Sequence, residues 1–248
     1  MDTLDLKEAL VNFGQIPKHP RWIASFLRGG REGLYKQATV DSLMSIRRAS
    51  PISKLTDLET IPLTTPIGQM GGTQELLYPL VRFLRPKAIV ETGVYRGLST
   101  AFMLAAVADN GMGKVYSVDL PSASYYNPGT KEYDRTVLRG HETPGFAIPV
   151  ELKDNWTLVV GPSKQVLPPL LDKLGQIDLF VHDSEHTYDC MWWEFTEAFA
   201  HIKPGGVLAS DDVEKNSAFR DFVAAKGLAW STTREGRLGI ALKGMPIK

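Results

Sequence analysis

The chain has 248 residues, which suits one large α/β domain with extensions at least as well as two small domains. Its 28 basic and 28 acidic residues leave no net charge, which argues against the long-range attraction that draws basic proteins to nucleic acids or anionic membranes. The single cysteine, Cys190, excludes an internal disulfide and a thiolate zinc cluster. We therefore expect a small-molecule substrate, and oxygen or imidazole ligands for any metal.

The first residues, MDTLDLKEALVNF, lack the basic and apolar stretches of a secretory signal. No apolar run approaches the roughly 18 residues that are needed to span a bilayer. These features predict a soluble, cytoplasmic protein that has neither a membrane nor a nucleic acid as its partner.

The first 72 residues are expected to form an extension to the main domain. Apolar residues recur at helical spacing through residues 1–50, as in LKEALVNF and WIASFLRGG. Residues 51–72 are rich in Pro, Thr and Gly without a sustained period, which is typical of a loop. The helical part suits a dimer contact or an active-site cover, so a homo-oligomer is left open.

From residue 73 onward, helical and strand patterns alternate along the chain. The expected elements are a helix over TQELLYPLVRFLR, a buried strand AIVETGV, a helix LSTAFMLAAVA and a strand VYSVDL. Residues 121–154 interrupt this rhythm and mix aromatic residues with Pro and Gly. We expect this segment to be an insertion that acts as a lid or a binding loop.

The alternation resumes after the insertion. The expected elements are a strand WTLVVG, a helix SKQVLPPLLDKL, a strand IDLFVHD, a helix TYDCMWWEFTEAFAHI, a strand GVLASDD, a helix AFRDFVAAKG and two strands around Glu235-Gly236. Strands that alternate with helices imply right-handed crossovers and a parallel sheet covered on both faces. The predicted fold class is α/β: a Rossmann-like, doubly wound, seven-stranded, mostly parallel sheet over residues 73–248, with an antiparallel C-terminal hairpin and the helical N-terminal extension.

Ligands of such sheets bind beyond the carboxyl ends of the strands. The first strand leads into ETGVYRGLST, where glycines let the backbone approach a ligand and the next helix exposes its amides. This spacing is not GxGxxG, and Glu91 suits the amino group of an amino-acid-like cofactor better than a pyrophosphate. The second strand ends at Asp119, a carboxylate that can hold a ribose. The structural alternatives are a plain tight turn at the first site and a helix cap or solvated strand end at the second.

These segments resemble a known family. IVETGVYRGLST with VYSVDL is similar to the first two motifs of class I S-adenosylmethionine-dependent methyltransferases, and LVVGPSKQVLP to their adenine-side motif. IDLFVHDSEHTY with IKPGGVLASDDV resembles the subgroup of cephalosporin-hydroxylase-type proteins and macrolide-sugar O-methyltransferases. The resemblance covers residues 73–226, with Tyr95 standing where many class I enzymes have a glycine. It implies that S-adenosylmethionine is held by Glu91, Gly93, Tyr95, Gly97, Ser99, Asp119, Gly161, Ser163 and Asp183.

Acidic residues end two neighbouring strands of the expected sheet. Asp183 ends IDLFVHD, and Asp211 and Asp212 end GVLASDD, so adjacent parallel strands would bring the three carboxylates to one rim. Three like charges in one cleft repel one another unless a cation joins them or a proton is retained. Hard oxygen ligands suit a divalent cation, with Mg²⁺ as the first choice, and we expect these three residues to bind it. The alternative is that one acid caps the next helix while the others are solvated.

Two histidines flank Asp183. His186 is the expected general base, because an imidazole pKa of about 6.5 suits proton transfer at neutral pH. With Asp183 it forms the predicted catalytic pair. His182 alternates to the opposite face of the strand, where a buried structural histidine is expected.

The combined prediction is a methyltransferase that transfers a methyl group from S-adenosylmethionine to a hydroxyl of a small molecule, with metal assistance. A sugar or another secondary metabolite is the expected acceptor. A nicotinamide-dependent oxidoreductase would share the sheet and the ribose acid, but it needs a glycine-rich pyrophosphate turn that the sequence lacks. A non-catalytic cofactor-binding or assembly protein would retain the same motifs, so the sequence leaves that alternative open.

Overall fold

The computed structural model describes residues 73–120, 126–127, 132–133, 138, 143–146, 148–232 and 237–244. The predicted N-terminal extension over residues 1–72 lies outside the described residues, and the boundaries of the main domain stay a prediction. None of the helices in the described ranges is both long enough and apolar enough to cross a membrane.

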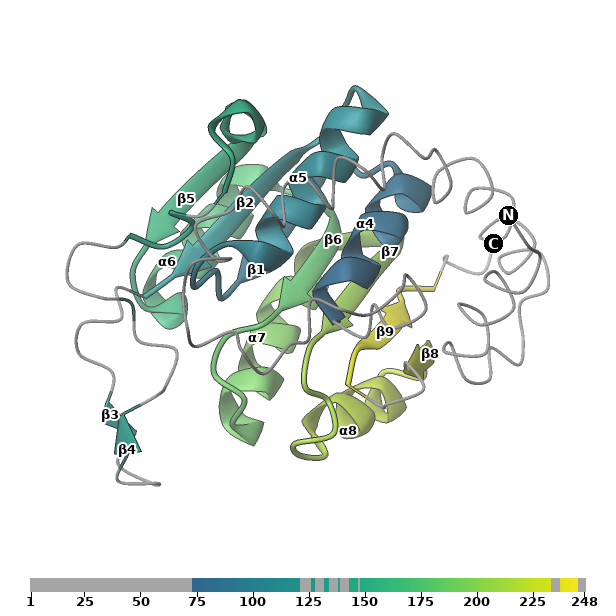
Figure 1. Ribbon diagram of the computed structural model, residues 1–248. Coiled ribbons are helices and arrows are strands. Elements are labelled where there is room, and N and C mark those ends of the chain that lie inside the picture. Colours follow the sequence, from purple (N-terminus) through teal and green to yellow (C-terminus); the bar gives the residue numbers. More distant parts are fainter. Residues whose placement is uncertain are drawn as a thin grey trace, which may run out of the picture.

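A seven-stranded sheet forms the centre of the molecule (Figure 1). Its order is β5-β2-β1-β6-β7-β9-β8. The strands are β1 (Ala88–Thr92), β2 (Lys114–Asp119), β5 (Trp156–Val160), β6 (Ile177–His182), β7 (Ile202–Ser210), β8 (Ala229–Thr232) and β9 (Gly239–Leu242). Neighbours from β5 to β7 are parallel, whereas β9 is antiparallel to both β7 and β8. The predicted fold class is confirmed for the sheet, and its strand order reverses between β1 and β6, where α/β sheets bind ligands.

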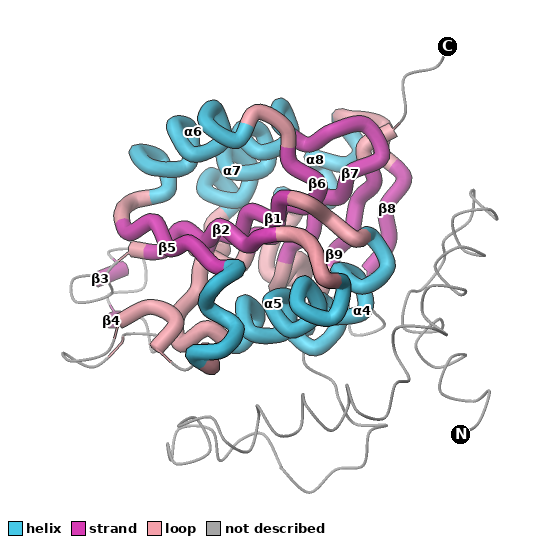
Figure 2. The backbone as a smooth tube through the Cα atoms, turned by 90° about the horizontal axis from the view of Figure 1, so that it is seen from above, coloured by secondary structure: helices cyan, strands magenta, loops and turns pink. Residues whose placement is uncertain are grey.

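Helices cover both faces of this sheet (Figure 2). The helices α4 (Thr73–Leu84) and α5 (Leu98–Asn110) lie on one face, and α6 (Ser163–Leu174), α7 (Tyr188–His201) and α8 (Ala218–Ala225) on the other. Each face has its own apolar core, and successive strand residues alternate between them: Ile89 belongs to the first core and Val90 to the second. The same alternation directs Glu91 toward α5, and directs Thr92 and His182 toward α7.

Two predicted segments differ in detail from the structure. Strand β7 begins at Ile202, four residues before the predicted start at Gly206, because Ile202 pairs with Ile177 and the register then shifts. Lys203-Pro204-Gly205 has the composition of a turn, so the sequence pattern did not predict this pairing. In the predicted 121–154 insertion, the described part contains an antiparallel pair of short strands, β3 (Tyr126–Asn127) and β4 (Glu132–Tyr133), and the 3₁₀ helix η5 (Val150–Asn155).

Candidate active site

The turn between β1 and α5, residues 93–97, has the backbone of a ligand-binding turn. Gly93 and Gly97 adopt φ values of 85° and 96°, and Tyr95 adopts 50°. Tyr95 thus keeps the left-handed conformation that glycine favours, at a cost of about 1–2 kcal/mol. We call residues 93–97 the cofactor turn. The predicted cofactor residues Gly93, Tyr95 and Gly97 therefore lie together at the carboxyl end of β1.

Asp119, at the end of β2, holds this turn in place. Its Oδ2 accepts hydrogen bonds from the backbone N–H groups of Val94 and Tyr95, both at 2.7 Å. Burial raises the pKa of the Asp119 carboxyl above its ordinary value, although the backbone donors oppose that shift. The N–H of Gly161 bonds to the Asp119 carbonyl at 2.8 Å, so the predicted adenine-side segment lies beside this acid. Because Asp119 Oδ2 already accepts hydrogen bonds from the turn, the predicted contact with a ribose hydroxyl would use Asp119 Oδ1.

Glu91 lies inside the protein, below the cofactor turn. Its side chain is fully buried, and it accepts hydrogen bonds from the hydroxyls of Ser99 at 2.7 Å, Thr100 at 2.7 Å and Ser117 at 2.8 Å. Both carboxylate oxygens are therefore engaged inside the protein, and the contact with a cofactor amino group stays a prediction. Ser99, also predicted to touch the cofactor, is one of these internal donors. Glu91 and Ser99 support the cofactor turn and the first turn of α5 from beneath.

We expect the free energy of unfolding to depend on pH through the Glu91 carboxyl. Burial raises its pKa from 4.5 to about 7, although its three hydroxyl donors oppose the rise. The folded state therefore keeps a proton that the unfolded state loses, and the stability of the wild type declines as the pH rises from 4.5 to about 7. We expect Glu91→Gln to raise the free energy of unfolding above neutral pH by up to about 3 kcal/mol, and to change it little near pH 5.

Thermal unfolding of Glu91→Gln and wild type at about pH 5 and about pH 8 measures this difference. Glu185→Gln, at an exposed acid, is the matched control. Equal shifts for Glu91→Gln at both pH values would contradict the expectation.

The described end of the predicted 121–154 insertion packs against the cofactor turn. The N–H of Gly145 donates to the Tyr95 carbonyl at 2.8 Å. A Cβ on Gly145 would lie 2.2 Å from the Trp156 ring, and one on Gly97 would lie 2.5 Å from Ile148. The described end of the predicted insertion is therefore part of the wall around the cofactor turn. Close approach requires glycine at both positions, and the Pro-Gly pair at 144–145 was the available sequence signal.

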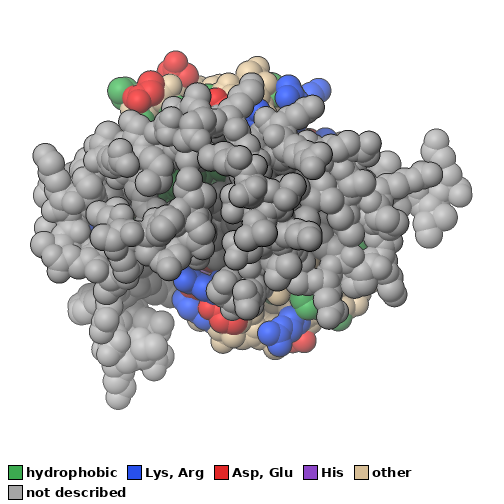
Figure 3. Space-filling model, turned by 45° about the vertical axis from the view of Figure 1, so that its right-hand side comes forward, with side chains coloured by type: hydrophobic (Ala, Val, Ile, Leu, Met, Phe, Trp, Pro, Cys, Tyr) green, Lys and Arg blue, Asp and Glu red, His purple; other side chains and the backbone are tan. Residues whose placement is uncertain are grey.

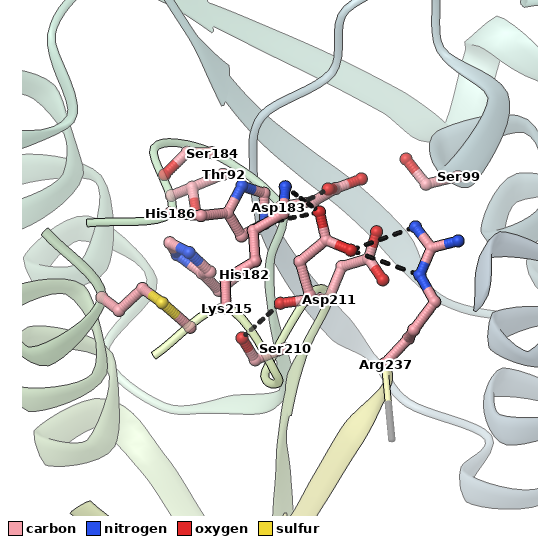
Figure 4. Close-up of polar contacts among 12 residues, drawn as sticks. Thr92, Ser99, His182, Asp183, Ser184, His186, Ser210, Asp211, Lys215 and Arg237 are labelled. Atoms are coloured by element: carbon pink, nitrogen blue, oxygen red, sulfur yellow. Dashed lines mark hydrogen bonds and ion pairs between the residues drawn. The ribbon is translucent and has the colours of Figure 1, made fainter. Parts of the chain in front are cut away.

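The acidic residues predicted to share a cation meet at the ends of β6 and β7. Figure 4 shows the side chains of Asp183 and Asp211 pointing toward each other, with His186 beside them. The charge of Asp211 opposes ionisation of Asp183, because two carboxylates that lie this close repel each other. Burial first, and then the charges of Asp211, Glu91 and Asp212, raise the pKa of Asp183 well above its ordinary value. Without a cation, this rim therefore favours the protonated form of Asp183 more than an isolated carboxyl would.

Asp212 has partners that the sequence analysis missed. Arg237 donates to its Oδ1 from Nη2 at 3.0 Å, and Lys215 Nζ forms an ion pair with Oδ2 (Figure 4 labels both cations). Burial opposes ionisation, yet the hydrogen bond from Lys215 and the nearby positive charges lower the pKa of Asp212. In the described residues, no group of three or more His, Cys, Asp or Glu side chains has the geometry of a metal site. The structure gathers the three predicted ligands at one rim but leaves Asp212 ion-paired.

His186 lies at the centre of this rim. Its Nε2 is 4.0 Å from Asp183 Oδ1 and 4.0 Å from Asp212 Oδ2. Within the described part of the chain this nitrogen is buried and makes no hydrogen bond. Burial, and then the neighbouring His182 and Lys215, lower the pKa of His186 to about 4. His186 is therefore neutral at physiological pH and can accept a proton through Nε2.

Three further polar residues near Asp183 lie away from the acidic rim, and His182 is buried, as the strand alternation predicts. His182 is fully buried, with Nδ1 2.8 Å from a carboxylate oxygen of Glu194. Asp178 lies at the far end of β6 and accepts hydrogen bonds from the backbone N–H groups of Lys87 and Ala88. Glu185 is exposed.

The two predicted sites adjoin each other. A Cβ on Gly93 would lie 1.9 Å from the carbonyl oxygen of Asp183, so the cofactor turn is in contact with the loop after β6. We call residues 183–187 the acceptor-side loop. The N–H of Asp183 also donates to the Thr92 carbonyl at 2.8 Å, which continues the β1–β6 ladder up to the site. A group bound at the cofactor turn would therefore lie next to His186 and the acidic rim.

Comparisons with known proteins agree with this geometry. The sequence profile of a family described as "Methyltransferase domain" matches residues 90–213, half of the chain. No curated protein matches the sequence. Solved structures with a similar fold include CalS11, a calicheamicin methyltransferase, at 18% identity and a TM-score of 0.52, covering 86% of this chain and 96% of that one.

Two further solved structures were determined with a cofactor or its product. The O-methyltransferase TomG from Streptomyces achromogenes, in complex with SAM, has 16% identity and a TM-score of 0.50, and the match covers 85% of this chain and 91% of that one. An O-methyltransferase from Bacillus cereus, in complex with SAH, has 14% identity and a TM-score of 0.50, with 89% and 97% coverage. At these identities the likeness establishes the fold, and the family match establishes the family. The chain belongs to the methyltransferase-domain family and is a class I S-adenosylmethionine-dependent methyltransferase.

Proposed function

We propose that the protein transfers a methyl group from S-adenosylmethionine to a hydroxyl of a small molecule, such as a sugar or another secondary metabolite. The observation that carries this proposal is His186, a neutral and buried base whose Nε2 has no hydrogen-bond partner in the described residues. It lies beside the cofactor turn, which meets the acceptor-side loop at Asp183. TomG and the Bacillus cereus protein, which share the fold, are O-methyltransferases by name.

The site residues fit S-adenosylmethionine. Gly93, Tyr95 and Gly97 form a turn with positive φ values, and Asp119 and Gly161 lie beside it. When bound, S-adenosylmethionine supplies an electrophilic methyl carbon on a sulfonium. We assign the backbone of the cofactor turn to the methionine part, Asp119 to the ribose, and Gly161 with Ser163 to the adenine side.

The acceptor-side loop supplies the proton chemistry. His186 Nε2 would take the proton of the acceptor hydroxyl as its oxygen accepts the methyl group that S-adenosylmethionine would supply, with S-adenosylhomocysteine as the leaving group. A positioned base of this kind contributes about 10²–10⁴-fold to the rate. Asp183 orients the hydroxyl toward His186. Alignment of the oxygen, the methyl carbon and the sulfur supplies most of the remaining acceleration.

A small acceptor is favoured over a polyanionic one. The chain has no net charge, and on the described part of the face in Figure 3 acidic and basic side chains lie beside one another. A chain without net charge does not provide the net positive field that attracts nucleic acids or anionic lipids. Location in the cytoplasm and assembly into a homo-oligomer stay predictions from the sequence.

The test is an acceptor screen. The protein is incubated with S-adenosylmethionine and a panel of sugars, glycosides and phenols, and S-adenosylhomocysteine release and product mass are followed. We expect calorimetry to show S-adenosylmethionine binding, and at least one hydroxylated acceptor to gain a methyl group on oxygen. Methylation on nitrogen or carbon would reject the proposed acceptor class. Cofactor binding without turnover on any acceptor would favour the non-catalytic alternative.

The metal-assisted form of the reaction is a further part of the proposal. Asp183 and Asp211 fit a divalent cation, because their carboxylates adjoin and repel each other. Asp212 would join them only after releasing Lys215 and Arg237. A bound cation would polarise the acceptor hydroxyl and lower its pKa.

Removal of divalent ions tests this part separately. We expect a chelator to lower turnover by about tenfold or more, and added Mg²⁺ to restore it, because Lewis-acid stabilisation contributes several kcal/mol. In Asp211→Asn, more Mg²⁺ should be needed for half-maximal activity. Asp189→Asn, at an exposed acid on α7, is the control. Turnover and acceptor KM that are both insensitive to chelator would show that the rim works without a cation.

A further inference from the structure

A charged residue lies in the apolar core directly beneath the active site. Glu194, in the middle of α7, is fully buried, and its neighbours Met191, Phe195 and Ala198 belong to the core on the same face. A buried carboxylate is costly unless hydrogen bonds and charges compensate it. Its presence in an otherwise apolar helix face therefore calls for a specific set of partners.

The partners of Glu194 come from both halves of the active site. Thr92 Oγ1, at the end of β1, donates to Oε2 at 2.5 Å, and His182 Nδ1, at the end of β6, lies 2.8 Å from the same oxygen. Ser184 Oγ, in the acceptor-side loop, lies 3.0 Å from both carboxylate oxygens. Cys190 contributes a weaker contact of 3.7 Å from within α7. Glu194 is thus tied to the residue before the cofactor turn and to the residue after Asp183.

These contacts of Glu194 lie directly beneath the point where the cofactor turn and the acceptor-side loop meet. Thr92 precedes Gly93, whose added Cβ would collide with the backbone of Asp183 and lie 2.8 Å from the N atom of Ser184. The ring of His182 packs edge-on against that of His186, with 5.4 Å between centroids. Glu194 therefore stabilises the contact between the cofactor turn and the acceptor-side loop.

We propose that Glu194 is a positioning residue that fixes the cofactor turn and the acceptor-side loop relative to each other. This inference rests on the proposed function, because it takes His186 and Asp183 as the groups that act on the acceptor. Methyl transfer requires the acceptor oxygen in line with the methyl carbon and sulfur, and a misplacement of about 1 Å can cost about 10²-fold in rate. Loss of the ties should therefore slow the transfer step more than it weakens binding of either substrate.

Glu194→Gln tests the proposal, because glutamine keeps the volume but offers one acceptor oxygen in place of two, so Thr92, His182 and Ser184 cannot all keep their contacts. The measurements are kcat and acceptor KM with an acceptor identified by the screen, the Kd of S-adenosylmethionine by calorimetry, and the unfolding temperature. We expect kcat to fall by about 10- to 100-fold, with Kd and KM changed by no more than about threefold. Glu197→Gln, three residues further along α7, is the matched control and should keep wild-type kinetics.

Ser184→Ala provides a second test that does not depend on how well Glu194→Gln folds. It removes the hydrogen bond between Glu194 and the acceptor-side loop and leaves the contacts of Glu194 with Thr92 and His182, so kcat should fall while the Kd of S-adenosylmethionine is kept. In the double variant the two effects on kcat should be less than multiplicative, because both remove the same tie. A wild-type kcat in folded Glu194→Gln or in Ser184→Ala would overturn the proposal. A parallel loss of kcat, cofactor affinity and unfolding temperature would also overturn it, since that pattern indicates a purely structural role.

Failure of this proposal is distinguishable from failure of the proposed function. Normal turnover of His186→Ala would reject the assigned acceptor chemistry, whatever Glu194→Gln does. A slow His186→Ala together with a normal Glu194→Gln would reject the positioning role alone.

Discussion

Replacing His186 with alanine is expected to lower kcat by about 10²–10⁴-fold, the usual contribution of a positioned general base. The Kd of S-adenosylmethionine should stay close to that of the wild type, because the cofactor turn is built on β1 and β2 and not on this side chain. Since its surroundings lower the pKa of His186 to about 4, the base is already neutral throughout the physiological range. The kcat of the wild type should therefore be nearly constant between about pH 6 and pH 8, whereas an ordinary histidine would titrate there.

His201→Ala is the matched control for this variant. His201 ends α7, where its Nδ1 lies 2.9 Å from the Gly175 carbonyl and its Nε2 3.7 Å from Asp172, and no contact within the described residues joins it to the acidic rim. Steady-state kinetics of both variants with the same acceptor, together with calorimetry, separate catalysis from binding. A near-normal kcat in His186→Ala would remove the base assignment. A rise of wild-type kcat through a midpoint of about 6.5 would instead indicate an unperturbed histidine.

Gly93→Ala is expected to destroy the cofactor site and to destabilise the fold. The added Cβ would lie 1.9 Å from the carbonyl oxygen and 2.4 Å from the carbonyl carbon of Asp183, both backbone atoms of an adjoining segment. The φ of 85° adds strain for any residue that has a Cβ. Conformational strain of about 1–2 kcal/mol and overpacking of about 1–3 kcal/mol together predict a loss of about 2–5 kcal/mol in unfolding free energy.

Gly111→Ala separates these two contributions. Gly111 has a comparable φ of 64° at the end of α5, but a Cβ there would meet nothing within 4 Å. This control should show only the conformational strain, and it should bind S-adenosylmethionine normally. Denaturant unfolding and calorimetry on both variants give the comparison. Equal destabilisation of the two variants, or intact cofactor binding in Gly93→Ala, would show that the cofactor turn and the acceptor-side loop are not in rigid contact.

Local patterns in the sequence were sufficient for the sheet and for placing Asp183 and His186 directly after one of its strands. Helix α6 has the predicted bounds, and the strand that ends at His182 leads directly to Asp183 and His186. Apolar runs and helical periods report whether a segment is buried and with what repeat, and that information is local. The carboxyl ends of parallel strands necessarily share one edge of the sheet, so the meeting of Asp183 with Asp211 could also be predicted.

The partners of the charged groups were decided only by the tertiary structure. Asp212 adopts a φ of 50° and reaches Arg237, 25 residues away across the β7–β9 pair. Glu91 turns inward to three hydroxyls because its place in β1 directs it toward α5, and Glu194 finds Thr92, 102 residues away, because β1 and β6 are neighbours above α7. The sequence shows where a carboxylate stands in the chain. Strand order, register and the backbone φ angle decide whether that carboxylate faces a cofactor, an arginine or a buried hydroxyl. The position of Glu194 within the apolar stripe of α7 was the sequence feature that marked it as unusual. Its hydrogen-bond partners follow only from the packing of α7 under the ends of two strands.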